Sequence, residues 1–332
     1  MKRPKTHLLS HPEIAAVLTM ERAIEAVEQV MKAHGRRHVI APDLLHADAP
    51  RGEFHIKTGG VLHGEDGGVF GLKANGGFFG NHSLGLPNIV GIIYLADART
   101  GCPLAILDSV EISRVRTGAA TAVAARHLAR PDSAVMTVIG TGTQARTQIE
   151  ALAHVLPIRR VHLVGRDRDR SIAQAAAFEA TLSLEVEAFS TIPAALKGAD
   201  VLVTCTPSRV PLVRRADIHP GLFIAAIGAD SPGKQELSAA LTAHCTAVAD
   251  VHHQCIHVGE LQHPIQAGLM TPEQVHAELG AVLCGQRPGR THAEEVTLYD
   301  STGTALQDVA VGFAVYEAAR AGGLGQSIQL GG

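Results

Sequence analysis

The amino-acid sequence predicts an α/β protein, with a doubly wound parallel sheet of the Rossmann type and a separate α+β domain. Two observations predict this fold class. Between residues 134 and 301, short apolar runs alternate with helical segments, which is typical of a parallel sheet covered by helices on both faces. Between residues 54 and 107, short runs are separated by glycine-rich turns, which is typical of an antiparallel sheet.

The composition is that of an ordinary globular protein. Of its 332 residues, 46% are hydrophobic and 18% are charged, which is enough for one large or two smaller domains. A net charge of −3 with scattered basic pairs offers no patch for nucleic acid. No apolar run approaches the roughly 20 residues that cross a bilayer, and no signal peptide is visible. We therefore expect a cytoplasmic protein without a membrane partner.

The first domain is expected to begin with a helix over residues 19–35 and to continue with strands. Thr19 can cap this helix and Gly35 can end it, and one face is apolar. That face carries Ala23, Ile24, Val27, Val30 and Met31. The antiparallel strands are predicted at "EFHIK", "VFGLKA", "NIVGIIYLAD" and "PLAILDS".

The second domain is expected to follow an alanine-rich helix over residues 116–128. Its strands are predicted at "AVMTVI", "RRVHLV", "SLEVEAF", "DVLVTC", "LFIAAIG", "TAVAD" and "EVTLYDS". Its helices are predicted over residues 143–155, 169–180 and 192–197. A last helix over residues 305–319 is predicted to return the chain to the first domain.

The segment "GTGTQA" has the glycine spacing of a dinucleotide-binding turn. It follows an apolar strand and opens a helix, the context that gives this spacing its meaning. Gly140 permits the tight turn, Gly142 lets the backbone approach a pyrophosphate, and Ala145 allows close packing of helix and strand. Thr143 and Gln144 complete the predicted cofactor-binding segment at the helix N-terminus.

The end of the next strand favours NADP(H) over NAD(H). Gly165 stands where an acidic residue would bind the ribose 2′-hydroxyl of NAD, and Arg166 and Arg168 suit a 2′-phosphate. Asp167 follows one or two positions late, so NAD(H) remains the alternative.

Six segments, in this order, resemble the ornithine cyclodeaminase and mu-crystallin family over nearly the whole chain. They are "GLKANGGFFGN", "GLP", "RTGAATAVAARHLA", "GTGTQA", "IGADSPGKQEL" and "DSTGTALQD". The resemblance implies an NAD(P)-dependent homodimer whose substrate-binding and dimerisation domain is formed by both chain ends. We place that domain at residues 1–115 and 309–332, and the NAD(P)-binding Rossmann domain at residues 116–308.

The resemblance also implies an oxidoreductase that acts on the Cα–N bond of an amino or imino acid. The first expectation is an ornithine cyclodeaminase-like reaction, in which a diamino acid gives a cyclic imino acid and ammonia. An NADPH-dependent ketimine or imino acid reductase of the pyrroline-2-carboxylate type, or an amino acid dehydrogenase, is the alternative. A non-catalytic protein that binds NADP(H) or a small ligand is the alternative of another class.

Three residues match functional positions of that family. Lys73 matches a catalytic lysine near the substrate carboxylate and imine, Arg116 matches an arginine that binds the carboxylate, and Asp230 matches a catalytic aspartate that handles the substrate amine. The chemistry agrees, because arginine offers a planar fork for a carboxylate and lysine adds a proton donor. Thr206 and Ser208 of "TCTPS" match the family's cofactor contact.

Two departures from the family pattern concern the substrate and the reaction. Leu44 stands near the place of a second carboxylate-binding arginine, and alternation along the strand puts Glu53, His55 and Lys57 on one face as replacement contacts. The NADP-like strand end favours a reductase, whereas the "GADSPGKQEL" loop resembles that of a cyclodeaminase.

We expect no metal site. "DVHHQCIH" groups His252, His253, Cys255 and His257, but a strand would point the first two side chains in opposite directions. The five cysteines are an odd number without a C-x-x-C spacing, which indicates neither disulfides nor a zinc site, and we expect small buried hydrophobes. No histidine is paired with Cys205 in a motif, so we do not expect a nucleophile there.

Overall fold

The computed structural model describes residues 5–64, 67–78 and 80–330. The chain divides into two compact units, one formed by Met1–Ala119 with Thr304–Gly332 and the other by Ala120–Gly303. The division falls inside helix α3 (Val110–Leu128) and just before helix α11 (Ala305–Ala321). Arg116 and Asp308 therefore both belong to the first unit.

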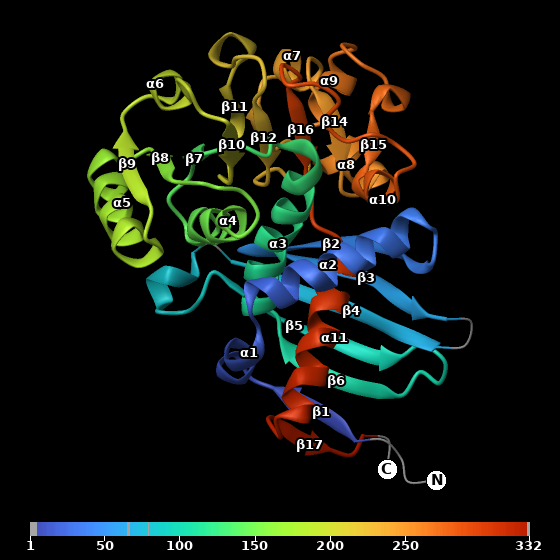
Figure 1. Ribbon diagram of the computed structural model, residues 1–332. Helices are drawn as coiled ribbons and strands as arrows, with labels where there is room; N and C mark the ends of the chain where they lie inside the picture. The colour runs from blue at the N-terminus through green and yellow to red at the C-terminus, as the bar shows by residue number, and fades with distance from the viewer. Residues whose placement is uncertain (1–4, 65–66, 79, 331–332) are drawn as a thin grey trace. The chain divides into compact units, whose positions relative to one another are not determined.

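The first unit contains a seven-stranded sheet (Figure 1) in the order β17-β1-β6-β5-β4-β3-β2. The strands from β3 to β6 pair antiparallel, as predicted. Strand β2, which was not among the predicted strands, pairs antiparallel to β3, and β1 pairs parallel to β6. Their bounds are β1 Thr6–Leu9, β2 Val39–Ala49, β3 Gly52–His63, β4 Gly67–Gly77, β5 Ile89–Asp97, β6 Pro103–Asp108 and β17 Gln326–Ile328. A short 3-10 helix, Asn81–Leu84, lies between β4 and β5.

Helices α1 (His11–Val17), α2 (Met20–Gly35) and α11 belong to this unit, and α11 packs on β3 and β4 and beside α2. The predicted N-cap of α2 is confirmed, because the Thr19 hydroxyl accepts a hydrogen bond from the Arg22 backbone N–H at 3.2 Å. All five apolar side chains predicted for its buried face are buried. The return of the last helix to the first domain is also confirmed.

Helix α3 begins six residues before its predicted start at Arg116. The Asp108 carboxylate accepts a hydrogen bond from the Val110 backbone N–H at 2.9 Å, which satisfies one of the unpaired donors at the start of a helix. Aspartate and serine at 108 and 109 are residues that favour helix starts, and alanine content alone did not reveal this start.

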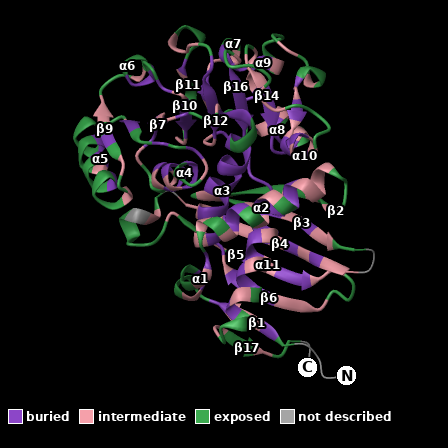
Figure 2. Cartoon of the chain, viewed as in Figure 1, coloured by how far each residue is buried: buried purple, intermediate pink, exposed green. Residues whose placement is uncertain are grey.

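The second unit contains an eight-stranded sheet in which every pairing is parallel, which confirms the predicted Rossmann-type sheet. The strand order is β15-β14-β16-β12-β10-β7-β8-β9, so the order reverses between β7 and β10, the place where such sheets bind nucleotides. Figure 2 shows its central strands as buried, in agreement with their continuous apolar sequences. The bounds are β7 Val135–Ile139, β8 Arg160–Val164, β9 Glu185–Phe189, β10 Val201–Thr204, β12 Phe223–Ala226, β14 Thr246–Ala249, β15 Ala277–Glu278 and β16 Thr297–Asp300.

Short helices and a two-stranded sheet complete the second unit. The helices are α4 Thr143–Ala153, α5 Arg168–Leu182, α6 Ile192–Leu196, α7 Ala239–Thr242, α8 His252–Val258, α9 Gln262–Gln266 and α10 Leu279–Leu283. The small sheet pairs β11 (Arg209–Val213) with β13 (Gln235–Leu237). Two 3-10 helices span Arg215–Asp217 and Pro272–Gln274.

Two expectations from the sequence were wrong. The "DVHHQCIH" segment forms helix α8 and not a strand, because it continues past the sheet after Asp250 and closes helical hydrogen bonds onto Val251. Of the five cysteines only Cys255 is buried, and the other four are partly exposed.

Among the described residues, no helix has the length and apolar character that a membrane crossing requires.

Candidate active site

Four charged side chains meet in the interior of the first unit. Lys57 on β3 and Lys73 on β4 are directly paired across the two strands. Arg116 comes from α3 and Asp308 from the first turn of α11. Their exposed fractions are 6%, 4%, 8% and 0% respectively, so all four charges are buried.

Asp308 lies between the lysine and the arginine. Its Oδ2 atom is 2.7 Å from Lys73 Nζ, and its Oδ1 atom accepts a hydrogen bond from Arg116 Nε at 2.9 Å. The Arg116 guanidinium also donates from Nη1 to Gln307 Oε1 at 3.0 Å, so two acceptors on α11 fix its plane. The Gln307 amide nitrogen is buried and has no hydrogen-bond partner among the described residues.

The surroundings lower the pKa of Lys73 to about 7. Burial is the largest cause, because it penalises the charged ammonium, and the positive charges of Arg116 and Lys57 act in the same direction. The Asp308 carboxylate opposes these effects without cancelling them. Burial raises the pKa of Asp308 itself, but Arg116 and Lys73 outweigh it and hold that pKa below the usual range, so the carboxylate stays ionised.

This arrangement can bind an anion and exchange a proton. Three basic side chains surround one carboxylate, and buried charge is costly unless it is balanced, so a carboxylate ligand complements the cluster. A lysine with a pKa near 7 is populated in both protonation states at neutral pH, which suits a general acid or base.

The predicted replacement contacts lie next to this cluster. β3 is an inner strand between β2 and β4, so Lys57 and His55 are not on a sheet edge. Leu44 on β2 lies directly opposite Lys57 in the register. His55 Nε2 is 3.2 Å from Glu53 Oε1, so His55 contacts Glu53 on the same strand.

In the second unit, the predicted dinucleotide turn joins β7 to α4. Gly140 has a φ of +127°, and a Cβ atom there would lie 2.8 Å from Cys205 Sγ, so only glycine fits. Gly142 is the N-cap of α4, and a Cβ atom there would meet nothing within 4 Å, which leaves its backbone open to a ligand. Ala145 is fully buried, Thr143 is exposed and Gln144 is partly exposed at the start of this helix.

The end of β8 leaves no room for an acidic side chain at position 165. A Cβ atom on Gly165 would lie 2.6 Å from Ser171 Oγ and 2.7 Å from Thr141 Cγ2. Arg166 is exposed. Asp167 is the N-cap of α5, where its carboxylate accepts a hydrogen bond from the Arg170 backbone N–H at 3.0 Å.

Thr206 and Ser208 lie in the loop after β10. Their hydrogen bonds organise that loop, because the Ser208 backbone N–H donates to Thr206 Oγ1 at 3.2 Å. The buried Glu236 carboxylate accepts from the backbone N–H groups of Thr206 at 2.6 Å and Gly228 at 2.9 Å. Glu236 therefore ties together the loops that follow two neighbouring strands of the parallel sheet.

Asp230 lies in the second of these loops, with a side chain that is 43% exposed. Its Oδ1 atom is 2.6 Å from Lys234 Nζ and accepts a hydrogen bond from Ser231 Oγ at 3.2 Å. A substrate amine that binds Asp230 would therefore compete with the Lys234 ammonium.

Comparison with known proteins identifies the family of this chain. The model of the ornithine cyclodeaminase/mu-crystallin family matches residues 5–323. The chain belongs to this family. The recognition made from the six sequence segments is thus confirmed.

Known relatives match this chain along almost its full length. The alanine dehydrogenase of Archaeoglobus fulgidus is 35% identical over 329 residues, which is 98% of this chain and 99% of the relative. The structure of an archaeal alanine dehydrogenase dimer with bound NAD has a TM-score of 0.92 at 34% identity and covers 98% of this chain and 99% of its own. The Thermococcus litoralis Δ1-pyrroline-2-carboxylate reductase with NADH and L-proline has a TM-score of 0.91 at 27% identity, covering 97% of this chain and 100% of its own.

Sequence reasoning missed three residues that organise the sites of this family member. Asp308 and Gln307 stand in the segment "DSTGTALQD", which carried the family resemblance but to which we assigned no role. A carboxylate within the largely apolar first half of the predicted helix was the signal for Asp308, because such a charge needs a buried partner. Glu236 stands in the segment "IGADSPGKQEL", and nothing in its sequence context apart from its charge indicated a role.

Two glycine substitutions are expected to separate folding from cofactor binding. Gly140→Ala should lower the free energy of unfolding by about 1–3 kcal/mol, since alanine is strained at this φ and contacts Cys205. Gly142→Ala should leave that free energy within about 0.5 kcal/mol. It should nevertheless raise the dissociation constant for NADPH about tenfold or more, because its methyl group projects where a pyrophosphate would approach. Urea denaturation and fluorescence titration measure the two effects, and equal stability of both variants would contradict the assignment.

Proposed function

We propose that the protein is an NAD(P)-dependent oxidoreductase that acts on the Cα–N bond of an amino or imino acid, and that it reduces an imino acid in a single step. The observation that carries this proposal is the buried cluster in which Lys73, with its pKa near 7, lies beside Arg116. The family membership and the names of the matching alanine dehydrogenase and pyrroline-2-carboxylate reductase support it.

Arg116 and Lys73 have distinct roles in this reaction. Arg116, held in one orientation by Asp308 and Gln307, binds the substrate carboxylate and positions the imine carbon. When bound, NAD(P)H supplies the hydride that Cα accepts. Lys73 in its protonated form donates the proton that the imine nitrogen needs, so that one hydride and one proton convert the imine to an amine.

The reaction also needs a site for the nicotinamide cofactor, and the second unit offers one. The turn at Gly140 and Gly142, together with the N-terminus of α4, fits a pyrophosphate, since the backbone there is open and the helix end carries a positive partial charge. We assign Thr143, Gln144 and Ala145 to the same site, with Thr206 and Ser208 in the neighbouring loop.

A direct assay tests the reaction. Purified protein is incubated with pyrroline-2-carboxylate and NADPH or NADH, and the loss of nicotinamide absorbance is followed. A parallel reaction contains L-ornithine with a catalytic amount of NAD⁺ or NADP⁺, and ammonia and proline are measured. Reduction of the imine supports the proposal, whereas cofactor binding without turnover of any amino or imino acid would leave a non-catalytic binding protein.

Cyclodeamination is the second candidate, and Asp230 is the residue that favours it. The Asp230 carboxylate, in the Gly-Ala-Asp-Ser-Pro-Gly loop, can orient and deprotonate the terminal amine of a diamino acid once that amine has replaced the Lys234 ammonium as its partner. Ammonia and proline formed from ornithine with catalytic cofactor, and lost in Asp230→Asn, would make this the reaction. Formation that persists in Asp230→Asn would remove the aspartate from the mechanism.

We further propose that NADP(H) is the preferred cofactor, although NAD or NADH is bound in the matching structures. Arg166→Ser should lower kcat/KM for NADPH about 10- to 100-fold, since hydrogen bonds to a charged group contribute about 1.5–3 kcal/mol. The value for NADH should change little. Arg160→Ser, at the opposite end of β8, is the matched control. A wild-type enzyme that prefers NADH, with no effect of Arg166→Ser, would establish the NAD reading.

We also propose a homodimer that forms through the sheet face that α11 does not cover. In the register Leu45 lies opposite Ile56, and Ala74 lies opposite Ile92. Four apolar side chains on this face are exposed: Leu45 at 55%, Phe54 at 43%, Val90 at 52% and Ile92 at 45%. A contiguous exposed apolar surface indicates a protein interface, and the matching archaeal alanine dehydrogenase is a dimer.

The dimer proposal predicts a change of oligomeric state. Ile92→Asp should convert the dimer into a monomer in light scattering coupled to size-exclusion chromatography, because it buries an unpaired carboxylate in the interface. Ile172→Asp on α5, where the side chain is 50% exposed, should leave the mass unchanged. A wild-type monomer, or a dimer that Ile92→Asp leaves intact, would contradict the assigned face.

A further inference from the structure

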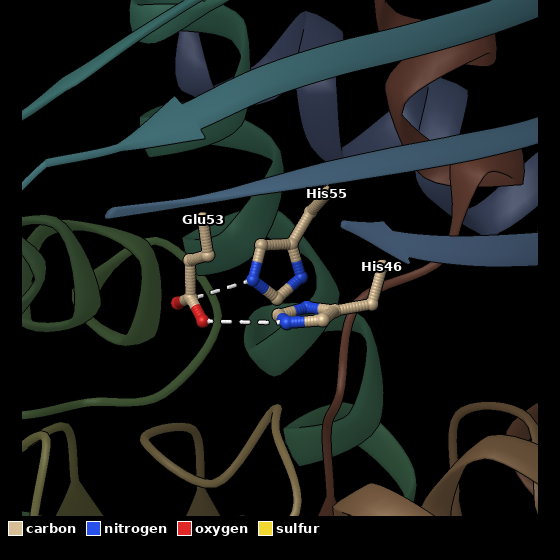
Figure 3. A group of neighbouring side chains, drawn as sticks. All are labelled: His46, Glu53 and His55. Atoms are coloured by element: carbon tan, nitrogen blue, oxygen red, sulfur yellow. Dashed lines mark ion pairs between the residues drawn. The ribbon is translucent and has the colours of Figure 1, made fainter. Parts of the chain in front are cut away.

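Two histidines and a glutamate converge on one side of β2 and β3 (Figure 3). His46 and His55 are directly opposite in the antiparallel register, so their side chains leave the sheet on the same face. Glu53 precedes His55 by two positions on the same strand and therefore shares that face. The strand pairing alone is enough to bring the three side chains together.

The three side chains present their ligand atoms to one point. One Glu53 oxygen is 3.2 Å from His55 Nε2, and the other is 3.8 Å from His46 Nε2. The two imidazole rings are 4.8 Å apart between centroids and inclined at 82°, so they converge without stacking. One ligand atom from each residue lies within 4.8 Å of the other two. Atoms that bind a tetrahedral zinc ion at about 2.1 Å lie about 3.4 Å from one another, so small rotations suffice.

The donor set is one that proteins use for transition metals. Two imidazole nitrogens and one carboxylate bind zinc in catalytic sites, and the same set binds non-haem iron with coordination positions left open. Asp48 offers a further oxygen, because its Oδ1 atom lies 3.1 Å from His46 Nε2 on a side chain that is 90% exposed. The side chains of Glu53 and His55 are 29% and 19% exposed, which leaves an approach for an ion.

We propose that His46, Glu53 and His55 form a binding site for a divalent transition metal ion, with Zn²⁺ as the ion that fits the donor set. This departs from the expectation of no metal, because that expectation considered only the histidines near residue 252 and not the pairing of β2 with β3. The site is two residues along β3 from Lys57, so a bound ion adds positive charge to the sheet face that carries the lysine pair.

A simpler interpretation makes a different prediction. Glu53 could serve only as an acidic partner for the two imidazoles, with no affinity for metal. In that case chelator-treated protein would take up Zn²⁺ weakly and without a fixed stoichiometry, and substitution of these residues would not change the uptake. The two interpretations are therefore separated by a binding measurement that does not depend on the enzymatic reaction.

The test is titration of the full-length, chelator-treated protein with ZnCl₂ by isothermal calorimetry. CoCl₂ is used in parallel, because its visible absorption reports coordination by nitrogen and oxygen. We expect one Zn²⁺ per chain, and we expect His46→Ala and Glu53→Gln each to raise the dissociation constant by at least about tenfold, since even partners outside the ligand set change metal affinity by 10–100-fold. Circular dichroism and the unfolding midpoint establish that each variant is folded, and Glu53→Gln preserves the shape of the side chain.

A second histidine pair on the same chain provides the matched control. His253 and His257 on α8 have rings 4.9 Å apart, the spacing at which a helix itself can bind zinc. The double variant His253→Ala, His257→Ala should leave both stoichiometry and affinity unchanged. The proposal is overturned if the wild-type protein shows no saturable binding, or if this control variant loses the ion while His46→Ala and Glu53→Gln retain it.

Discussion

Replacing Lys73 with methionine is expected to lower kcat/KM for imino acid reduction by about 10³-fold, since general acid catalysis contributes 10²–10⁴-fold. Methionine keeps an unbranched apolar side chain, one atom shorter than that of lysine, but cannot donate a proton to the imine nitrogen. Steady-state assays with saturating cofactor measure the change. Lys197→Met, at an exposed position of the second unit, should be indistinguishable from the wild type.

The same residue predicts a pH dependence. With a pKa of about 7, Lys73 is protonated below that pH and loses its proton as the pH rises through it. In the reductive direction kcat/KM should therefore fall as the pH rises through about 7, and in the oxidative direction, where a base is needed, it should rise over the same range. Lys73→Met should remove this limb from the profile. A limb that persists in the variant, or a loss of less than tenfold, would assign the proton to another group.

Replacing Asp308 with asparagine is expected to lower the free energy of unfolding by about 3–5 kcal/mol, the cost of leaving buried charges without their partner. Asp308 contacts both Lys73 and Arg116 and is fully buried, so no water replaces the lost carboxylate. Urea denaturation of the wild type and the variant gives this difference. Asp132→Asn removes an ion pair in which the aspartate is 83% exposed, and it should cost less than about 1 kcal/mol.

A double-mutant cycle shows whether the cost belongs to the ion pair. In the Lys73→Met background, Asp308→Asn should cost less than it does alone, because one of the two uncompensated cations is already gone. Additive costs would mean that Asp308 stabilises the first unit by a route other than Lys73. Activity should also fall in Asp308→Asn, since the Arg116 guanidinium loses the charged acceptor that fixes its Nε atom and keeps at most a neutral one.

Local patterns made the Rossmann-type sheet and its turn predictable from the sequence. The central parallel strands, such as β7 and β12, are mainly apolar runs. Gly140 follows β7 directly, so the strand, the turn and the helix are all encoded within about 20 residues. The antiparallel strands β3 to β6 were predictable because glycine-rich turns separate their short runs, whereas β2 was not among the predicted strands. The start of α3 was missed because it depends on one side-chain hydrogen bond from Asp108.

Residues that act through distant partners were not predictable in this way. Asp308 meets Arg116 across 192 positions, and no spacing in the sequence relates the two. His46 and His55 are nine positions apart, but they face each other only because β2 and β3 pair in one particular register. Alternation of side chains along β3 predicted that Glu53 and His55 share a face. It gave no information about His46, which lies on the neighbouring strand.

The discontinuity of the first unit has a consequence for the order in which the protein folds. Closing a flexible loop of 192 positions costs on the order of 5 kcal/mol in chain entropy, which the ion pair of Arg116 with Asp308 must overcome if it forms first. Residues 120–303 form a contiguous unit, so this unit can form without closing that loop. During synthesis on the ribosome this unit also emerges before α11. We therefore expect Asp308 to reach Lys73 and Arg116 late in folding. In pulsed hydrogen exchange, the backbone amides of β7 and β10 should become protected before those of β3 and β4.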